Sequence, residues 1–266
     1  MPACSSVLAS THYKHTNVGA PTLVFLHGLL GSQKDWLPVV EALAADYSCL
    51  TIDLPGHGDS ASIEGADFDT TAKWVLRAIE REIAGEIWLV GYSLGARIAM
   101  YTTAFHHALL PNAPFLIKAL VVESGHTGLA ETEREPRWQN DETWALRFEQ
   151  EPMSDVLQLW YEQAVFSSLN HEQKQSLVSI RGDNLGIKVA SMLRATSLSK
   201  QPLLSEPLRE SGIPVHFVCG KDDTKFSTLA MRSGFDYQIV PNAGHNIHAE
   251  QPKLFSQLVK QLIEAI

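Results

Sequence analysis

The sequence predicts an α/β fold in which a mostly parallel sheet is flanked by helices and interrupted by an inserted helical cap. Apolar runs of strand length alternate with helical patterns in residues 22–123, and this alternation is typical of βαβ units in a parallel sheet. Residues 129–198 break the rhythm, because they are charged, contain three tryptophans and lack a clear strand run. The alternation then resumes. We therefore assign residues 1–128 and 199–266 to a core domain and residues 129–198 to the cap.

The individual elements follow from local patterns. Short apolar runs predict buried strands, at 22–26, 48–52, 87–91, 116–123, 213–219 and 237–240. Apolar residues at helical spacing predict helices after Ser32 and at 67–83, 94–107 and 252–266. Ser32 is the expected cap of its helix, with Asp35 as partner in a partial capping box. The aromatic residues of the cap predict short amphipathic helices.

Composition excludes several classes of protein. The chain has 266 residues and a formal net charge of -9, which argues against a surface for nucleic acid or for an anionic membrane. We find no apolar run of transmembrane length and no signal-peptide pattern in residues 1–20. The three cysteines, Cys4, Cys49 and Cys219, are scattered, so we expect neither a metal site nor a redox pair. A cytoplasmic protein is therefore expected.

The segment Gly91-Tyr92-Ser93-Leu94-Gly95 carries the strongest chemical signal. A strand pattern precedes it and a helical pattern follows it, which is the context that a G-x-S-x-G nucleophile elbow requires. Side chains at positions 91 and 95 would collide where the strand turns sharply into the helix, so glycines are expected there. Ser93 is the candidate nucleophile or base, whereas the simpler interpretation is a glycine-rich turn with a solvated serine.

A serine hydroxyl needs a histidine to take its proton, and the histidine needs a carboxylate to orient it. In this architecture the order along the chain is Ser, Asp, His. Asp222 and Asp223 follow the expected strand 213–219, and His245 follows the strand 237–240. We choose Asp223 as the orienting carboxylate, His245 as the base and Asp222 as a solvated neighbour. His248 is expected to be structural.

An oxyanion hole is expected beside Ser93. It uses the amide after the nucleophile and an amide from the loop after the first strand, here those of Leu94 and Leu29. His27 and His57 are expected to brace their loops by hydrogen bonds.

Arg97 lies one helical turn after Ser93, on the same side of the expected helix. A cation near an enclosed site is costly unless an anion meets it. A local carboxylate would satisfy Arg97 within the protein, whereas a polyanionic small substrate would satisfy it from outside. Guanidinium groups match carboxylates through paired hydrogen bonds. The cap adds Arg134, Arg137, Arg147, Arg181 and Arg194, and most of these are expected on solvated faces.

These motifs together resemble one family of α/β-hydrolase-fold enzymes, the 2-succinyl-6-hydroxy-2,4-cyclohexadiene-1-carboxylate synthases of menaquinone biosynthesis. The resemblance includes segments shared by many α/β hydrolases, at 24–28, 50–58 and 88–95. Its more specific part lies in the cap, in segments 160–161, 165–170 and 195–198. The loop 243–246 completes it.

The resemblance implies that Ser93, Asp223 and His245 form the catalytic triad. It also implies that Arg97, Arg137 and Arg181 bind substrate and that Tyr92 and Trp160 line the pocket. Arg134 competes with Arg137 for the position facing the pocket.

The implied reaction is a lyase step. It eliminates pyruvate from 2-succinyl-5-enolpyruvyl-6-hydroxy-3-cyclohexene-1-carboxylate, with Ser93 activated by His245 as base. The implied partner is a small polycarboxylate substrate, with no cofactor and no metal, and we expect a monomer that does not insert into membranes. The first alternative is a serine esterase or thioesterase acting on a small carboxylate-bearing ester. A non-enzymatic binding protein of the same fold is the second, and it is disfavoured because all three triad residues are present.

Overall fold

A seven-stranded sheet forms the centre of the molecule, in the order β1-β3-β2-β4-β5-β6-β7. The structure is a computed structural model that describes residues 7–16 and 19–265. All neighbouring strands run parallel except β1, which pairs antiparallel with β3. The strands are β1 (Ser10–Tyr13), β2 (Thr22–Leu26), β3 (Cys49–Ile52), β4 (Gly85–Tyr92), β5 (Phe115–Glu123), β6 (Val215–Gly220) and β7 (Asp236–Val240). The predicted α/β class and mostly parallel sheet are confirmed.

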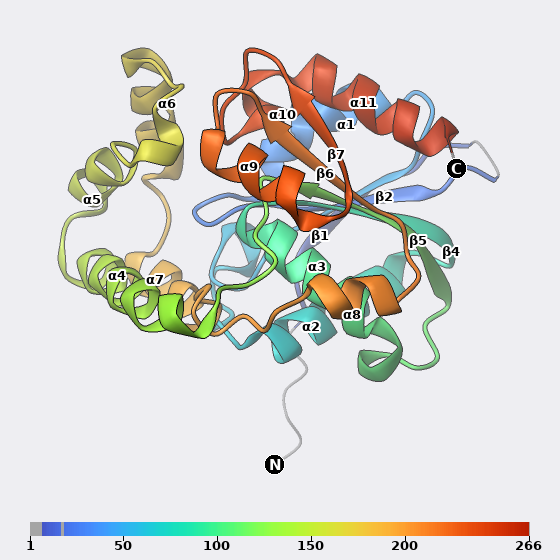
Figure 1. Cartoon of the computed structure of the whole chain (residues 1–266), viewed down its shortest axis with the longest axis horizontal. Coiled ribbons are helices and arrows are strands. Elements are labelled where there is room, and N and C mark those ends of the chain that lie inside the picture. The colour runs from blue at the N-terminus through green and yellow to red at the C-terminus, as the bar shows by residue number, and fades with distance from the viewer. Residues whose placement is uncertain (1–6, 17–18, 266) are drawn as a thin grey trace.

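Helices cover both faces of this sheet. In Figure 1, α1, α10 and α11 lie on one face, and α2, α3 and α8 lie on the other. The helices are α1 (Leu37–Leu43), α2 (Phe68–Glu82), α3 (Leu94–Leu109), α4 (Glu131–Gln150), α5 (Met153–Trp160), α6 (His171–Arg181), α7 (Gly186–Ala195), α8 (Ser205–Glu210), α9 (Thr224–Ser233), α10 (Ile247–Glu250) and α11 (Pro252–Glu264). The described residues also contain three short 3-10 helices, η1 (Gln33–Trp36), η2 (Gly58–Ser60) and η3 (Ala164–Phe166).

The strand sequences explain why the sheet is buried on both faces. Successive side chains of a strand point to opposite faces, and in β2 all four residues from Leu23 to Leu26 are fully buried. Leu23 and Phe25 pack with α1 and α11, whereas Val24 and Leu26 pack with α2 and α3. The continuous apolar runs of the sequence are therefore the expected mark of a sheet with two covered faces.

Helix starts follow the capping residues. Ser32 forms the expected capping box with Asp35, but the turn that follows is the 3-10 helix η1 before α1 begins. Asp67 caps α2 by accepting a hydrogen bond from the Thr70 amide at 2.8 Å. The first helical amides lack partners within the helix, and these side chains satisfy some of them.

The inserted helical region leaves the sheet after β5 and returns to it at β6. Helices α4–α7 form this region and lie to one side of the sheet in Figure 1. They share an apolar cluster, which includes Phe148, Leu157 and Tyr161 and also contains Leu30 from the core. The expected short helices are found in α5, α6 and α7, whereas α4 spans 20 residues and is longer than expected. The division at residues 129 and 198 stays a proposal.

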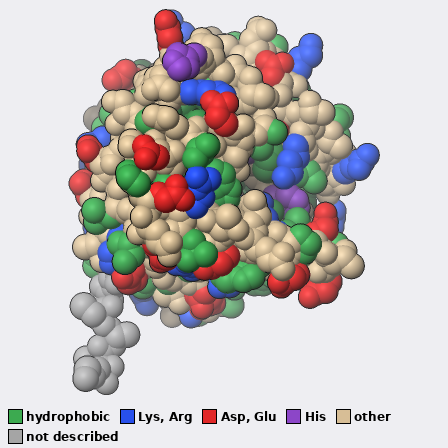
Figure 2. Space-filling model, turned by 90° about the vertical axis from the view of Figure 1, so that its left-hand side faces the viewer, with side chains coloured by type: hydrophobic (Ala, Val, Ile, Leu, Met, Phe, Trp, Pro, Cys, Tyr) green, Lys and Arg blue, Asp and Glu red, His purple; other side chains and the backbone are tan. Residues whose placement is uncertain are grey.

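The outer surface of the insertion carries charges of both signs. Figure 2 shows this side of the molecule, where acidic and basic side chains are interspersed and a hollow contains a histidine. None of the helices in the described part of the chain is long and apolar enough to cross a membrane.

Candidate active site

Ser93 occupies a strained turn between β4 and α3. Its backbone has φ 51° and ψ -107°, a left-handed region that non-glycine residues rarely adopt. The Ser93 amide donates to the carbonyl of Glu123 at 2.9 Å on the neighbouring strand, which helps to hold the turn. A Cβ atom at Gly95 would collide with the carbonyl of Leu26. This close approach explains why position 95 is glycine, as the motif predicts.

The loops after β6 and β7 bring a carboxylate and a histidine to Ser93. His245 Nδ1 lies 2.6 Å from Asp223 Oδ2, and His245 Nε2 lies 3.3 Å from Ser93 Oγ. Asp223 and His245 are both about 95% buried, whereas Asp222 is exposed. Because its ring nitrogens face a carboxylate on one side and a hydroxyl on the other, His245 can hold a proton at Nδ1 and accept one at Nε2.

Asp223 has a second contact that fixes its position. Its Oδ1 atom accepts a hydrogen bond from the Phe226 amide at 3.2 Å and so caps α9. The ring of Phe226 packs against the His245 ring, with 4.6 Å between centroids. Phe226 of α9 thus contacts both the carboxylate and the imidazole and helps to hold them in place, in addition to the hydrogen bond between them.

Two buried histidines hold the loop that carries Leu29. His27 Nδ1 donates to the carbonyl of Gly28 at 2.7 Å, and its Nε2 accepts from the Leu54 amide at 2.9 Å. His57 Nε2 accepts from the Leu30 amide at 3.0 Å. Burial lowers the pKa of His27 to about 4 and that of His57 to about 3. Both rings are therefore neutral at pH 7 and act as braces, as the sequence predicts.

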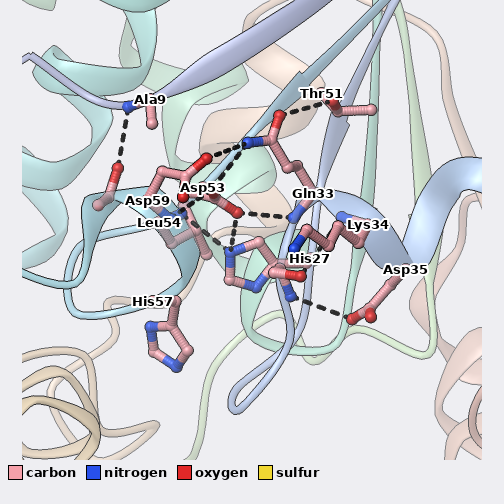
Figure 3. A network of polar contacts seen from close by, with 12 residues as sticks. Ala9, His27, Gln33, Lys34, Asp35, Thr51, Asp53, Leu54, His57 and Asp59 are labelled. Carbon is pink, nitrogen blue, oxygen red and sulfur yellow. Dashed lines mark hydrogen bonds and ion pairs between the residues drawn. The ribbon is translucent and has the colours of Figure 1, made fainter. Parts of the chain in front are cut away.

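A carboxylate next to these histidines ties three segments together. Figure 3 shows that Asp53 contacts Gln33, Asp59 and His27. Asp53 Oδ1 accepts from the Gln33 amide at 2.7 Å, and Oδ2 accepts from Gln33 Nε2 at 2.9 Å. Gln33 Oε1 in turn accepts from the Thr51 hydroxyl at 3.2 Å. This network fixes the loop after β2 against the end of β3.

The proposed oxyanion residues and part of the predicted pocket lie in one region. Leu94 begins α3 directly after Ser93. Leu29, Tyr92, Trp160 and Arg181 all line one small cavity of about 20 Å³. The cavity therefore lies between the core and the insertion, with residues from both.

Arg181 meets a carboxylate that the sequence reasoning did not connect with it. Its NH1 atom lies 2.7 Å from Asp35 Oδ1, and both side chains are largely buried. Burial opposes the charge of Arg181, but the pair with Asp35 outweighs it and raises the pKa of Arg181. No sequence spacing links residues 35 and 181. Their meeting follows only from the position of α6 over the core.

Arg97 is buried but meets no carboxylate. Its NH1 atom donates to the carbonyl of Thr196 at 2.7 Å, and its guanidinium lies 5.8 Å from the centre of the Phe68 ring. Within the described ranges, no carboxylate oxygen lies within 4.0 Å of its nitrogen atoms. The local ion pair that we considered is therefore absent from this part of the chain. Burial and the nearby charge of Arg137 lower the pKa of Arg97 to about 9.

Arg137 and Arg134 have different surroundings. Arg137 pairs with Asp141 at 2.8 Å and lines a larger cavity between α4 and α9. Arg134 donates to the carbonyl of Ser199 at 2.7 Å and is not among the residues that line that cavity. The geometry thus favours Arg137 over Arg134 as the residue that faces a cavity.

The remaining cap arginines behave as expected for a protein surface. Arg147 pairs with Glu151, and Arg194 pairs with Glu142 and Glu149. These groups are all at least a quarter exposed. Ion pairs that are exposed to this degree usually contribute little to stability.

Tyr92 and His248 form the wall behind His245. The Tyr92 ring packs edge-on against His245 and His248, at centroid distances of 5.4 and 4.9 Å. Burial raises the pKa of Tyr92 well above its ordinary value, so the phenol stays neutral. His248 Nδ1 lies 2.8 Å from Glu123 Oε2 and its ring stacks on Trp36. His248 is structural, as predicted, but its partner Glu123 was not foreseen.

Among the described residues, no group of three or more His, Cys, Asp or Glu side chains is arranged to hold a metal ion. The donor set at the candidate site is one hydroxyl, one imidazole and one carboxylate in series. This set can move a proton between Ser93 and His245 and stabilise the resulting imidazolium.

Comparisons with known proteins identify the family and the fold. The model of the alpha/beta hydrolase family matches residues 23–258, and a Ser–His–Asp series on this fold is characteristic of that class. The structure of MenH from S. aureus superposes with a TM-score of 0.85 at 26% identity, covering 96% of this chain and 98% of that chain. A thermophilic esterase from Thermogutta terrifontis gives a TM-score of 0.78 at 19% identity, covering 97% of this chain and 93% of that chain. The esterase shares the fold.

Sequence relatives are more specific. A 2-succinyl-6-hydroxy-2,4-cyclohexadiene-1-carboxylate synthase from Yersinia pseudotuberculosis is 44% identical over 249 residues, covering 92% of this chain and 88% of the relative. A synthase of the same name from Yersinia pestis is 43% identical over the same lengths. The chain belongs to the 2-succinyl-6-hydroxy-2,4-cyclohexadiene-1-carboxylate synthase family of α/β hydrolases.

Proposed function

We propose that this enzyme is a carbon–oxygen lyase of menaquinone biosynthesis. It eliminates pyruvate from 2-succinyl-5-enolpyruvyl-6-hydroxy-3-cyclohexene-1-carboxylate and leaves 2-succinyl-6-hydroxy-2,4-cyclohexadiene-1-carboxylate. The observation that carries this proposal is the 44% identity to a synthase over 92% of the chain. That span includes most of the inserted helices, the part of such folds in which substrate selection resides.

The chemistry needs a base and an anion site. The names of substrate and product show that a proton leaves ring carbon 2 and the bond from ring carbon 5 to the enolpyruvyl oxygen breaks. The ring double bond moves so that two double bonds result, and the released enolpyruvate takes up a proton to become pyruvate. The first step is proton abstraction next to a carbonyl, so negative charge develops on the succinyl carbonyl oxygen.

Ser93, His245 and Asp223 supply the base. His245 Nε2, 3.3 Å from Ser93 Oγ, takes the serine proton as the serine oxygen takes the proton from ring carbon 2. Asp223, 2.6 Å from Nδ1, stabilises the imidazolium that forms. No acyl-enzyme intermediate is required, and the reaction needs neither a cofactor nor a metal.

The amides of Leu29 and Leu94 form the proposed oxyanion hole. Leu94 is the first residue of α3, where helical amides have no partner within the helix and the helix dipole favours negative charge. Leu29 lies on the loop braced by His27 and His57. Rigid donors of this kind lower the barrier because they need no rearrangement when charge develops.

The substrate carries three carboxylates, which need cationic partners in the protein. We propose that Arg97, Arg137 and Arg181 bind them and that Tyr92 and Trp160 form apolar walls. Arg97 supports this proposal most directly, because it is buried and has no carboxylate partner in the described ranges. An anionic ligand would offset the cost of burying that charge.

The test is incubation of the purified protein with the enolpyruvyl cyclohexene substrate. We expect pyruvate, measured with lactate dehydrogenase, to appear in step with the absorbance of the conjugated diene. A panel of activated esters and thioesters measures the esterase alternative in parallel. Absence of pyruvate together with an initial burst of ester cleavage would replace the lyase proposal by the esterase one.

We propose further that the enzyme works as a monomer in the cytoplasm. Cys49 and Cys219 are free and buried, and burial raises the pKa of each thiol to about 12. Such thiols are unreactive and suit a reducing compartment. Cys4 lies outside the described residues. Light scattering after gel filtration tests the monomer, and cell fractionation tests the compartment.

A further inference from the structure

The larger cavity between α4 and α9, described above, is a groove of about 520 Å³ beside the candidate active site. Its lining includes three cations, Arg137, Lys225 and Arg232, and one carboxylate, Glu133. The whole chain has a formal net charge of -9. The groove is therefore locally basic although the protein as a whole is acidic, and its positive charges attract anions.

The groove adjoins the reacting groups. Lys225 follows two residues after Asp223, and the Lys225 amine lies 5.6 Å from the centre of the Phe226 ring. The Phe226 ring also contacts the His245 ring, at 4.6 Å between centroids. A ligand that reaches from Ser93 toward α4 therefore enters the field of Lys225.

Lys225, like Arg97, is a cation near the triad for which the described residues provide no ion pair. Arg137 pairs with Asp141, Arg181 pairs with Asp35, and Arg97 donates to a carbonyl. Lys225 forms no ion pair within 4.0 Å in residues 7–16 and 19–265. The side chain of Lys225 is exposed, and partial loss of solvation together with the charge of Arg137 lowers its pKa. An anion bound beside it would favour the ammonium form.

We propose that Lys225, with Arg137, forms an anion subsite that binds a carboxylate of the substrate at the outer end of the active site. This inference rests on the proposed lyase function, because the substrate with three carboxylates defines the ligand. Arg137 is partly neutralised by Asp141, whereas no carboxylate of the described residues pairs with Lys225. Glu133 opposes binding and limits the affinity for anions.

The substitution that tests the subsite is Lys225→Met, with Lys225→Arg as the conservative variant. We expect Lys225→Met to raise KM for the cyclohexene substrate about threefold to fivefold, in the upper part of the range for one exposed ion pair. The value of kcat should change much less, because the subsite is remote from the proton that moves. Lys225→Arg should keep KM within about twofold, since the charge remains.

A second variant makes the opposite prediction. Glu133→Gln removes the opposing charge but can still accept the hydrogen bond from the Ala130 amide that Glu133 now accepts at 3.2 Å. We expect its KM to fall. The matched control is Lys253→Met, which removes an exposed lysine from α11 and should leave KM unchanged. The KM of the parent enzyme should rise with KCl, and that dependence should weaken in Lys225→Met.

Binding without turnover separates this proposal from the lyase proposal. Calorimetry compares Ser93→Ala with Ser93→Ala/Lys225→Met as the same substrate is added. Weaker binding to the double variant supports the subsite even if the parent enzyme releases no pyruvate. Equal binding to both, or equal KM in Lys225→Met and the parent enzyme, overturns the subsite and leaves the lyase function standing.

Discussion

Asp35 and Arg181 join the core to the inserted helices through an ion pair of 2.7 Å. Asp35 belongs to η1 and Arg181 is the last residue of α6, so the contact spans the boundary of the small cavity beside Ser93. Burial opposes both charges, but each partner favours the charged form of the other. The pair therefore fixes the position of α6 over the site.

Breaking this pair should destabilise the protein. Asp35→Asn leaves Arg181 buried without a counter-charge, and we expect a loss of about 3–5 kcal/mol in the free energy of unfolding. The double variant Asp35→Asn/Arg181→Met should recover part of that loss, because the unpaired charge is gone. Urea unfolding of the parent protein, Asp35→Asn, Arg181→Met and the double variant measures the coupling. Additive losses would show that the two side chains do not act as a pair.

Ser93 and His245 should act as one unit. We expect Ser93→Ala and His245→Ala each to lower kcat for pyruvate release by about 10²- to 10⁴-fold. The double variant should be no slower than the worse single variant, because the two groups move the same proton. Multiplication of the two losses would contradict a shared step. His107→Ala, on the exposed end of α3, serves as the control.

Asp223→Asn should separate activity from stability. An asparagine keeps an oxygen for the Phe226 amide, so α9 stays capped and the free energy of unfolding should change by less than about 1 kcal/mol. It loses the charge that stabilises the His245 imidazolium, and kcat should fall by roughly 10²-fold or more. Circular dichroism melts and pyruvate assays test the two halves. A drop in the melting temperature as large as that of Asp223→Ala would mean that the carboxylate serves mainly the fold.

Arg97→Met should also lower activity without lowering stability, for a different reason. The guanidinium is buried with one carbonyl partner and no carboxylate in the described ranges, so replacement by an apolar side chain should leave stability unchanged or raise it. Loss of a charge-assisted contact to substrate should lower kcat/KM by about tenfold to a hundredfold. Unchanged turnover of the polycarboxylate would rule out an anion-binding role for Arg97.

Acid should destabilise the fold through His27 and His57. Their folded pKa values, about 4 and about 3, lie below the ordinary value of 6.5. The unfolded chain therefore binds protons that the folded chain does not, and stability falls as the pH drops from 6.5 toward 4. Between pH 6.5 and 5 the two histidines together should cost roughly 3 kcal/mol.

Urea unfolding at successive pH values measures this slope. His107→Gln changes an exposed histidine and should keep the slope of the parent protein. A parent protein with equal stability at pH 6.5 and pH 5 would show that these histidines are not neutral braces.

The sheet and the Ser–Asp–His series were readable because each has a local pattern. Strand β2 was predicted at residues 22–26 and is found there, since a short continuous apolar run bounded by turn residues is typical of a buried parallel strand. Chain order placed Asp223 and His245 at the ends of neighbouring strands, and β6 and β7 do pair. The antiparallel strand β1 was missed because Ser10–Tyr13 is short, polar and at the edge of the sheet.

The partners of the charged residues were not readable. Arg97 and Arg181 are both buried, yet of these two only Arg181 meets a carboxylate among the described residues. Whether a charge is paired depends on how the inserted helices pack on the core, and no spacing along the chain encodes that packing. Lys225 was overlooked for the same reason, because a lysine after a pair of aspartates in a turn has no periodic signal.

The inserted helices depart from β5 and return to β6, its immediate neighbour in the sheet. The two ends of the inserted segment therefore lie on neighbouring strands, and its length or sequence can change during evolution without moving any strand. Changes in the inserted helices can alter which acids are recognised, while Ser93, Asp223 and His245 keep their positions on the core. One ancestral frame can in this way give rise to hydrolases and to lyases alike.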